Sequence, residues 1–215
     1  FLDRNTVINN CVESNIFSHS KLIASENINI LLGSVNLNKN TLKGGEYITS
    51  ILKLINENHY LYNKCTILFF GISNKNEFQK MLNIKYKNIK SELNGYISCK
   101  HEMAKLYAKS DIFLHCSLIE NLSTVLIESE LSGCHSIAFN VGGNNEIIKN
   151  QDYLIPPYSE FILKYKLANL VARLYDSTID SRLITRNNIR KLAIQRFNDD
   201  NSIKKHIRFY NQKNI

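Results

Sequence analysis

The sequence predicts an α/β protein with a Rossmann-like parallel sheet and helices on both faces. Short apolar runs alternate along the chain with longer segments of helical periodicity, which is typical of successive βαβ units. The apolar runs are nearly continuous and do not alternate with polar residues, as in strands buried on both faces. The 215 residues, 44% of them hydrophobic, suffice for one large domain with its own core.

The first half of the chain supplies the first strands and helices of this pattern. Residues 28–33 (INILLG) form a short apolar run that predicts a buried strand, and 45–58 carries apolar residues at helical spacing. Residues 65–71 (CTILFFG) predict a second strand, which a short helix at 75–83 follows. The segment 88–97 is less apolar and predicts only one or two weak strands.

The second half repeats the alternation and then becomes helical. Its predicted elements are a helix at 100–110, a strand at 111–117, a helix at 123–133, a strand at 135–143, a short extended segment at 153–156 and helices from residue 159 onward. In such parallel sheets, ligands bind outside the carboxyl ends of the strands. The loops that follow the predicted strands are therefore the first place to look for a site.

Composition argues for a reducing compartment and against a structural metal. The five cysteines are odd in number and widely spaced, without a C-x2-C pair, and the histidines show no metal-ligand spacing. We therefore expect no metal and no cofactor. The cysteine pattern leads us to expect a cytoplasmic protein. No apolar run approaches the roughly 20 residues of a membrane span.

A polar turn before the helix at 123–133 is the main candidate site. Ser123 stands where a helix N-cap would stand, and the free N–H groups of a helix start suit a phosphate. Glu128 lies one and a half turns into the helix, where its carboxylate could accept hydrogen bonds from a ribose diol. Glu120 would reach a sugar beyond the phosphates. This spacing favours a nucleotide sugar, although two solvated glutamates and a simple cap remain an alternative.

At this point the sequence resembles a known family. Residues 120–148 (ENLSTVLIESELSGCHSIAFNVGGNNEII) are similar to the donor-site segment of family 4 glycosyltransferases, which have the glycosyltransferase B fold. LYAKSDIFLHCS (106–117), the K-G turn within 31–55 and TVINNCVESNIF (6–17) resemble further segments of that family. The resemblance implies that 1–215 is the C-terminal, nucleotide-sugar-binding half. It would begin with an interdomain stretch at 1–20, end with C-terminal helices at 160–215 and lack the N-terminal acceptor domain.

The resemblance also assigns roles to residues. It implies that Glu128 holds the donor ribose, that Glu120 contacts the transferred sugar and that Lys43 pairs with the diphosphate. Glu120 and Lys43 are the implied catalytic residues. The other implied donor-binding residues are Gly33, Ser34, Gly95, Tyr96, Ile97, Asn121, Leu122, Ser123 and Thr124. His115, on the strand before the loop, faces either the sugar or the core.

Several positions depart from the family pattern. Ser34 stands where arginine often assists the diphosphate, and Cys116 replaces the proline before the donor loop. The turn at Gly133 also lacks its usual proline, and Cys11 replaces a hinge glycine. These departures weaken the assignment to a subfamily more than they weaken the prediction of the fold.

The implied function is transfer of a sugar, with retention, from a uridine or guanosine diphosphate sugar to a saccharide or lipid-linked acceptor. The acceptor would bind to the missing N-terminal domain, so the isolated half is expected to be inactive. A nucleotide-sugar epimerase of the same fold and a non-catalytic nucleotide-sugar-binding module are the alternatives that the sequence leaves open.

Basic residues are concentrated at the C-terminal end. Residues 160–215 hold twelve Lys and Arg against five Asp and Glu, which is +7 of the total net charge of +8. Arg182, Arg186, Arg190 and Lys191 recur at intervals that place them near one helix face. Such a face would attract an anionic membrane, so we expect peripheral contact with the inner face of the cell membrane; a solvated helix is the alternative. We expect no nucleic-acid partner, because aromatic residues are not interleaved with the basic ones.

Overall fold

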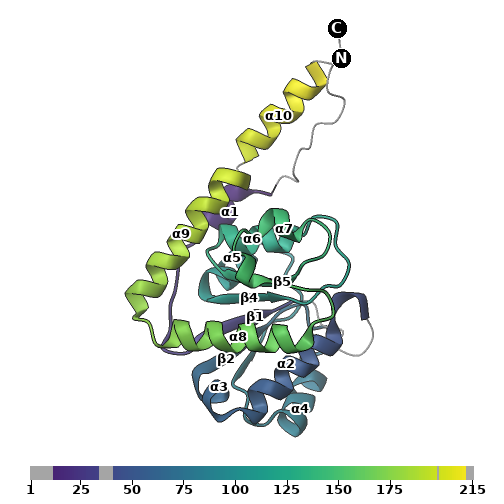
Figure 1. Cartoon of the computed structure of the whole chain (residues 1–215), viewed down its shortest axis with the longest axis vertical. Coiled ribbons are helices and arrows are strands. Elements are labelled where there is room, and N and C mark those ends of the chain that lie inside the picture. Colours follow the sequence, from purple (N-terminus) through teal and green to yellow (C-terminus); the bar gives the residue numbers. More distant parts are fainter. Residues whose placement is uncertain (1–11, 34–40, 198, 212–215) are drawn as a thin grey trace.

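The computed structural model describes residues 12–33, 41–197 and 199–211, and a six-stranded parallel sheet forms its centre. The strand order is β3-β2-β1-β4-β5-β6 (Figure 1), so the order reverses between β1 and β4. The strands are β1 (Ile28–Leu32), β2 (Cys65–Phe69), β3 (Ser91–Leu93), β4 (Ile112–His115), β5 (His135–Phe139) and β6 (Leu154–Ile155). This topology confirms the predicted Rossmann-like sheet, and its reversal point is where such sheets bind ligands.

Helices cover both faces of the sheet, as predicted. α2, α3 and α8 pack together in one layer, and α1, α5, α6 and α9 pack together in the other (Figure 1). The helices are α1 (Ser14–Ser18), α2 (Gly45–Glu57), α3 (His59–Lys64), α4 (Lys75–Lys85), α5 (Lys100–Lys109), α6 (Thr124–Leu131), α7 (Asn144–Ile147), α8 (Glu160–Tyr175), α9 (Ile179–Phe197) and α10 (Asp199–Asn211), with 3-10 turns η1 (Thr41–Lys43) and η2 (Gln151–Tyr153).

The short helices α1 and α3 were not predicted from the sequence. α3 follows α2 after a single residue, Asn58, whose backbone is extended and whose side chain accepts a hydrogen bond from the Leu61 N–H. This asparagine ends one helix and caps the next, so the chain turns without the glycine or proline that usually marks a boundary.

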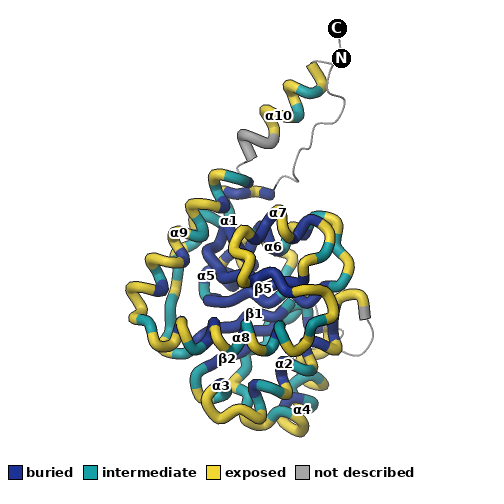
Figure 2. Tube along the Cα trace, viewed as in Figure 1, coloured by how far each residue is buried: buried dark blue, intermediate teal, exposed yellow. Residues whose placement is uncertain are grey.

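The central strands β1 and β5 are buried (Figure 2), whereas the edge strand β3 is less so. All five residues of β1 and all five of β5 are buried. The three residues of β3 are only half-buried, and β3 pairs with β2 alone. An edge strand with one covered side needs fewer apolar residues, which explains the weak signal that segment 88–97 gave in the sequence.

Helix α9 contradicts the expectation of an exposed cationic face. The Arg182 and Arg186 side chains are 3% and 1% exposed, and Arg190 is half-buried. The buried Asp111 carboxylate lies 3.8 Å from Arg182 Nη1 and 3.6 Å from Arg186 Nη1. The prediction is therefore wrong for these three arginines, whereas Lys191 is exposed.

The Arg186 side chain is buried because it donates hydrogen bonds to backbone carbonyls, some of them at the ends of other helices. Its guanidinium donates hydrogen bonds to the backbone carbonyls of Ile23, Tyr107, Ala108 and Gly133. The last carbonyls of a helix have no partner within that helix. Two of these carbonyls belong to the last turn of α5 and one follows α6, so Arg186 closes two helix ends and fastens α9 to the domain.

Candidate functional site

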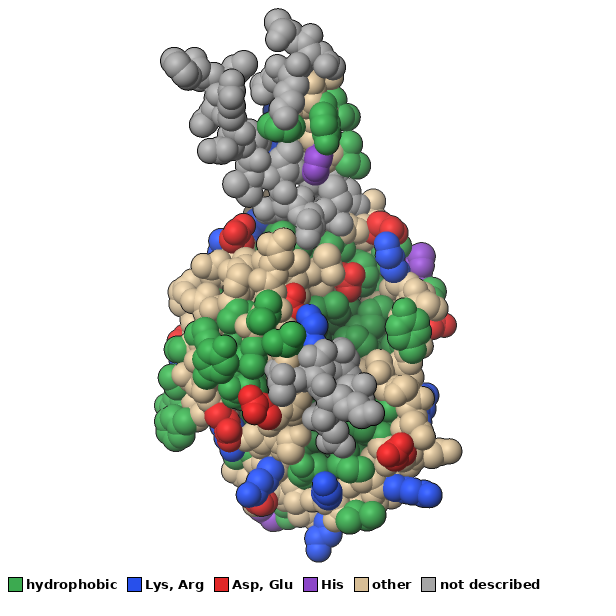
Figure 3. Space-filling view, turned by 90° about the vertical axis from the view of Figure 1, so that its right-hand side faces the viewer, with side chains coloured by type: hydrophobic (Ala, Val, Ile, Leu, Met, Phe, Trp, Pro, Cys, Tyr) green, Lys and Arg blue, Asp and Glu red, His purple; other side chains and the backbone are tan. Residues whose placement is uncertain are grey.

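The ends of β1, β2 and β4, the loop after β4, Lys43 of η1 and the start of α6 meet at the carboxyl edge of the sheet. They enclose a cavity of about 250 Å³, and Figure 3 shows hydrophobic side chains gathered in the depression on this face, with charged side chains nearby. The cavity is lined by Gly33, Lys43, Phe70, Phe113, Leu114, His115, Cys116, Glu120, Leu122, Ser123, Thr124 and Val125. It therefore contains six of the residues that the sequence assigned to donor binding.

Lys43 and Glu120 are 77 residues apart in the chain but in contact in this cavity. Lys43 Nζ lies 2.9 Å from Glu120 Oε1, and the side chains are 46% and 13% exposed. His115 Nε2 lies 3.1 Å from the same oxygen and 3.3 Å from Ser123 Oγ. The structure thus brings the two predicted catalytic residues together and adds His115 to them.

The surroundings of Glu120 keep its carboxylate ionised. Burial alone raises its pKa, but hydrogen bonds from His115, Lys43 and Ser117 outweigh burial and bring the pKa to about 2. Lys43 thus has an anionic partner in the absence of a ligand. An anion of higher charge that enters the cavity would compete for the ammonium group and free Glu120 to accept hydrogen bonds from a neutral group.

Helix α6 begins without a side-chain cap. Ser123 occupies the N-cap position, as predicted, but its hydroxyl makes no capping hydrogen bond and contacts His115 instead. The first N–H groups of an α-helix lack intrahelical partners and carry partial positive charge. Because Thr124 and Val125 also line the cavity, the start of α6 offers these N–H groups to an anion.

Two glycine turns hold the loop that carries Glu120. A Cβ atom on Gly44 would lie 1.8 Å from the Cys116 carbonyl oxygen, and one on Gly142 would lie 1.9 Å from the Glu120 carbonyl oxygen. Both glycines have positive φ, +70° and +52°, which disfavours other residues independently of space. The Gly143 N–H donates a hydrogen bond of 2.6 Å to the Asn121 carbonyl. Asn121 therefore helps to fix the loop and does not line the cavity.

Glu128 lines a second cavity of about 180 Å³ that adjoins the first. Phe70 and Val125 line both cavities, so one extended ligand could occupy the two. Ile97, one of the residues that the family resemblance implied for donor binding, also lines the second cavity. Burial raises the pKa of Glu128 to about 7, although Lys100 and the Tyr107 hydroxyl act in the opposite direction.

The remaining predicted residues lie beside these cavities or outside the described part of the chain. Gly95 and Tyr96 line a neighbouring cavity of about 460 Å³, which shares Ile97 with the Glu128 cavity. Ser34 and residues 1–11 of the expected interdomain stretch lie outside the described residues.

Sequence reasoning missed three groups at this site: Phe70, Tyr107 and Lys100. Phe70 follows β2 and precedes Gly71, and this position at a strand end was its only signal. In the parts of the chain that the structure describes, no three His, Cys, Asp or Glu side chains gather as metal ligands. Within the same ranges, no helix combines the length and apolarity needed to cross a membrane.

A sequence model for glycosyl transferases group 1 matches residues 16–195. The chain belongs to this family. A relative from Campylobacter jejuni subsp. jejuni serotype O:2, a GalNAc-alpha-(1->4)-GalNAc-alpha-(1->3)-diNAcBac-PP-undecaprenol alpha-1,4-N-acetyl-D-galactosaminyltransferase, is 26% identical over 167 residues. That match covers 77% of this chain and 44% of the relative.

Solved glycosyltransferases of the glycosyltransferase B fold confirm the fold of this group 1 chain. Anabaena Alr3699/HepE, solved with UDP, superposes with a TM-score of 0.71 at 18% identity, over 96% of this chain and 57% of that one. A glycosyltransferase from Rickettsia africae ESF-5 gives 0.71 at 20% identity, over 96% and 56%. The chain thus spans somewhat more than half of these structures and less than half of the Campylobacter relative, as expected for a C-terminal glycosyltransferase domain.

Proposed function

We propose that this chain supplies the donor site of a retaining glycosyltransferase. Lys43 and the start of α6 bind the diphosphate, Glu128 binds the ribose and Glu120 contacts the sugar that is transferred. One observation carries the proposal: Lys43, Glu120 and the uncapped start of α6 line one cavity, and Glu128 lines the cavity that adjoins it. This order of cation, helix start and carboxylate suits a nucleoside diphosphate sugar.

The chemistry proposed for the site requires neither a metal nor a cofactor. As the bond between the sugar and the diphosphate breaks, negative charge grows on the departing diphosphate. Lys43 and the N–H groups of α6 stabilise that charge from fixed positions in a partly buried cavity. Glu120, released from Lys43 by the diphosphate, then accepts hydrogen bonds from sugar hydroxyls.

The donor is proposed to be a uridine or guanosine diphosphate sugar. Structures of Anabaena HepE with UDP and with UDP-glucose make UDP the first ligand to test. The acceptor is proposed to be a saccharide or a lipid-linked saccharide bound by a further domain; the name of the Campylobacter relative includes an undecaprenol-linked saccharide. This chain alone is proposed to bind donor but to transfer no sugar.

Calorimetric titration with UDP, GDP and uridine tests the site. Lys43→Ala is expected to weaken UDP binding about tenfold or more, because charge-assisted contacts contribute about 1.5–3 kcal/mol, and to leave uridine binding unchanged. Glu128→Gln is expected to weaken both ligands, because both contain ribose. Lys53→Ala, which removes an exposed lysine of α2, is the matched control. Equal UDP affinities for Lys43→Ala and Lys53→Ala would contradict the proposal.

Activity assays separate transfer from the alternatives. With a UDP-sugar and no acceptor, the chain is expected to release no UDP and to leave the sugar unchanged. Release of UDP together with an altered sugar would instead identify an epimerase.

Peripheral contact with an anionic membrane at the inner face of the cell membrane is the last part of the proposal, and we assign it to α10. Lys204, Lys205 and Arg208 are exposed on this helix. Ile203 and Ile207, one turn apart, are 49% and 53% exposed. A helix with exposed basic and apolar side chains suits an anionic bilayer surface, and Figure 1 shows α10 extending away from the sheet.

Cosedimentation with vesicles tests this assignment. The chain is expected to bind vesicles that contain phosphatidylglycerol, and binding is expected to fall as salt rises. Replacing the three α10 cations with glutamine should abolish binding, whereas the same replacement of Lys80, Lys85 and Lys87, exposed on and just after α4, should not. Equal binding to neutral vesicles would contradict a charge-based attraction.

A further inference from the structure

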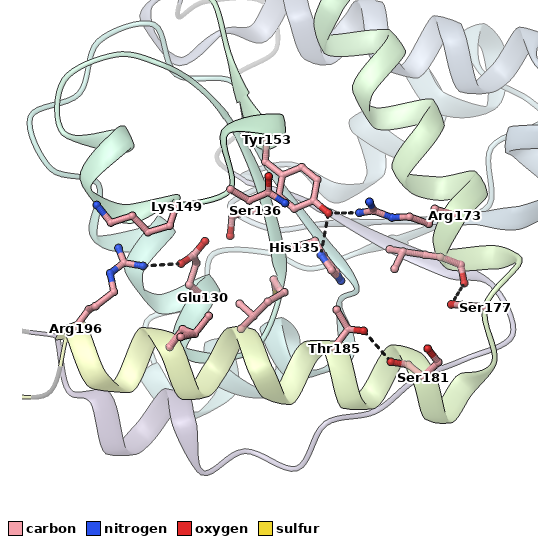
Figure 4. A pocket seen from close by; sticks show the side chains of 15 residues that line it. Glu130, His135, Ser136, Lys149, Tyr153, Arg173, Ser177, Ser181, Thr185 and Arg196 are labelled. Carbon is pink, nitrogen blue, oxygen red and sulfur yellow. Dashed lines mark hydrogen bonds and ion pairs between the residues drawn. The ribbon is translucent and has the colours of Figure 1, made fainter.

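A cavity of about 520 Å³ lies apart from the donor site, between the start of β5 and helices α8 and α9 (Figure 4). None of its lining residues lines either of the two donor cavities. Its walls combine polar side chains from β5, α8 and the segment before η2 with apolar side chains of α8 and α9.

His135, the first residue of β5, holds an unsatisfied nitrogen in this cavity. Its side chain is 4% exposed, and its Nε2 has no hydrogen-bond partner among the described residues. Buried polar atoms are nearly always hydrogen-bonded, so an exception needs an explanation. Figure 4 shows the imidazole ring between Tyr153 and Thr185, on the wall of the cavity.

The hydrogen bonds around His135 determine what Nε2 can offer. Arg173 Nη2 donates to the Tyr153 hydroxyl oxygen, and that hydroxyl lies 3.4 Å from His135 Nδ1. We assign the Tyr153 hydroxyl as donor to Nδ1, because Arg173 already donates to its oxygen, and this assignment places the ring proton on Nε2. Burial and the nearby Arg173 lower the pKa of His135 to about 4, which keeps the ring neutral. Nε2–H is thus a donor without an acceptor.

The charges around the cavity favour an anion. Arg173, Arg196 and Lys149 line it, and the one carboxylate on its wall, Glu130, lies 3.7 Å from Arg196. Arg173 contacts Tyr153, which in turn contacts His135 Nδ1, so this cation lies on the Nδ1 side of the His135 ring. Among the residues that line the cavity, cations therefore outnumber carboxylates.

The rest of the wall is suited to an apolar group. Leu174 of α8 and Ile189 and Leu192 of α9 line the cavity, and Leu192 is 59% exposed even though it is a large apolar side chain. We propose that this cavity is a second ligand site, which binds a small amphiphilic organic anion. The anionic group pairs with Arg173 on the wall that also holds His135, and a short apolar chain covers Leu174, Ile189 and Leu192.

Sodium octanoate and 1-octanol are the probes for this site, because they share a chain length and differ in charge. In a carbon–proton NMR spectrum of the chain, the His135 ring signal is expected to shift saturably with octanoate below its micelle concentration. Octanol is expected to bind about tenfold more weakly, because it lacks the charge-assisted contact.

Two variants make the test specific. Arg173→Gln, on an exposed residue of α8, is expected to weaken octanoate about tenfold. Lys166→Gln, which removes another cation of α8 that does not line the cavity, should leave octanoate unchanged. The proposal is overturned if octanoate does not move the His135 signal, if octanol binds equally well or if Arg173→Gln binds octanoate like the wild type. UDP titration of Arg173→Gln is expected to match the wild type, so this result is independent of the donor site.

Discussion

Replacing Glu128 with glutamine should stabilise the fold while it weakens the proposed nucleotide site. Burial raises the pKa of this carboxyl from 4.5 to about 7, which means that the folded chain holds a proton that the unfolded chain releases. The stability from this group is therefore fully present below pH 4.5 and is lost as the pH rises through about 7. Glutamine resembles the protonated acid at every pH and avoids that loss.

The size of the effect follows from the change in pKa. At about 1.36 kcal/mol per pKa unit, the full change corresponds to roughly 3.4 kcal/mol. Glu128 is only half-buried and solvent screens its charge, so we expect the glutamine variant to be about 2 kcal/mol more stable than the wild type at pH 8. At pH 5 the wild type is mostly protonated when folded, and the difference should fall below about 1 kcal/mol.

Urea denaturation of both proteins at pH 5 and pH 8 measures these differences. Glu57→Gln, at the exposed end of α2, is the control for loss of one negative charge. A glutamine variant that is less stable than the wild type at pH 8, or a difference that does not change with pH, would refute the reasoning. If the glutamine variant is more stable but binds uridine more weakly, Glu128 lowers the stability of the folded chain and contributes to ligand binding.

Three further predictions concern the Glu120 loop and the buried Arg186. Gly142→Ala should destabilise the chain by about 1–3 kcal/mol and abolish UDP binding, because the new Cβ meets the Glu120 carbonyl at 1.9 Å; thermal melts and calorimetry check this. Arg186→Met should cost about 3–5 kcal/mol in urea denaturation, because Asp111 and several carbonyls lose their buried cation. Glu120→Gln should be less stable than the wild type at pH 7. That difference should shrink as the pH falls from 4.5 toward 2, since the lowered pKa of Glu120 gives stability only above that range.

Periodicity predicted the sheet and most helices because buried strands and amphipathic helices leave a direct pattern in the chain. Lys43 and Glu120 were assigned to one site only through the resemblance to a family, and their direct contact was not predicted, since no local pattern reports a contact across 77 residues. Ser123 was assigned a capping role from its position, but tertiary contact with His115 takes its hydroxyl.

The arginines of α9 show where charge patterns mislead. Spacing placed Arg182, Arg186 and Arg190 near one face, and they do share a face, but that face is turned toward the domain. The sequence shows how the arginines are spaced, but it does not show that unpaired backbone carbonyls at the ends of other helices will accept their hydrogen bonds.

The glycine turns on either side of the Glu120 loop limit how this site can change during evolution. Gly44 and Gly142 need not touch a ligand, yet each leaves only enough room for a hydrogen atom next to a backbone oxygen. Substitutions at these two positions are therefore expected to distort the loop that carries Glu120. Under the proposed function, side chains that line the cavities are positions at which donor preference can change. A library that varies Leu122, Thr124 and Ile97 but keeps both glycines would explore new nucleotide sugars on an intact loop.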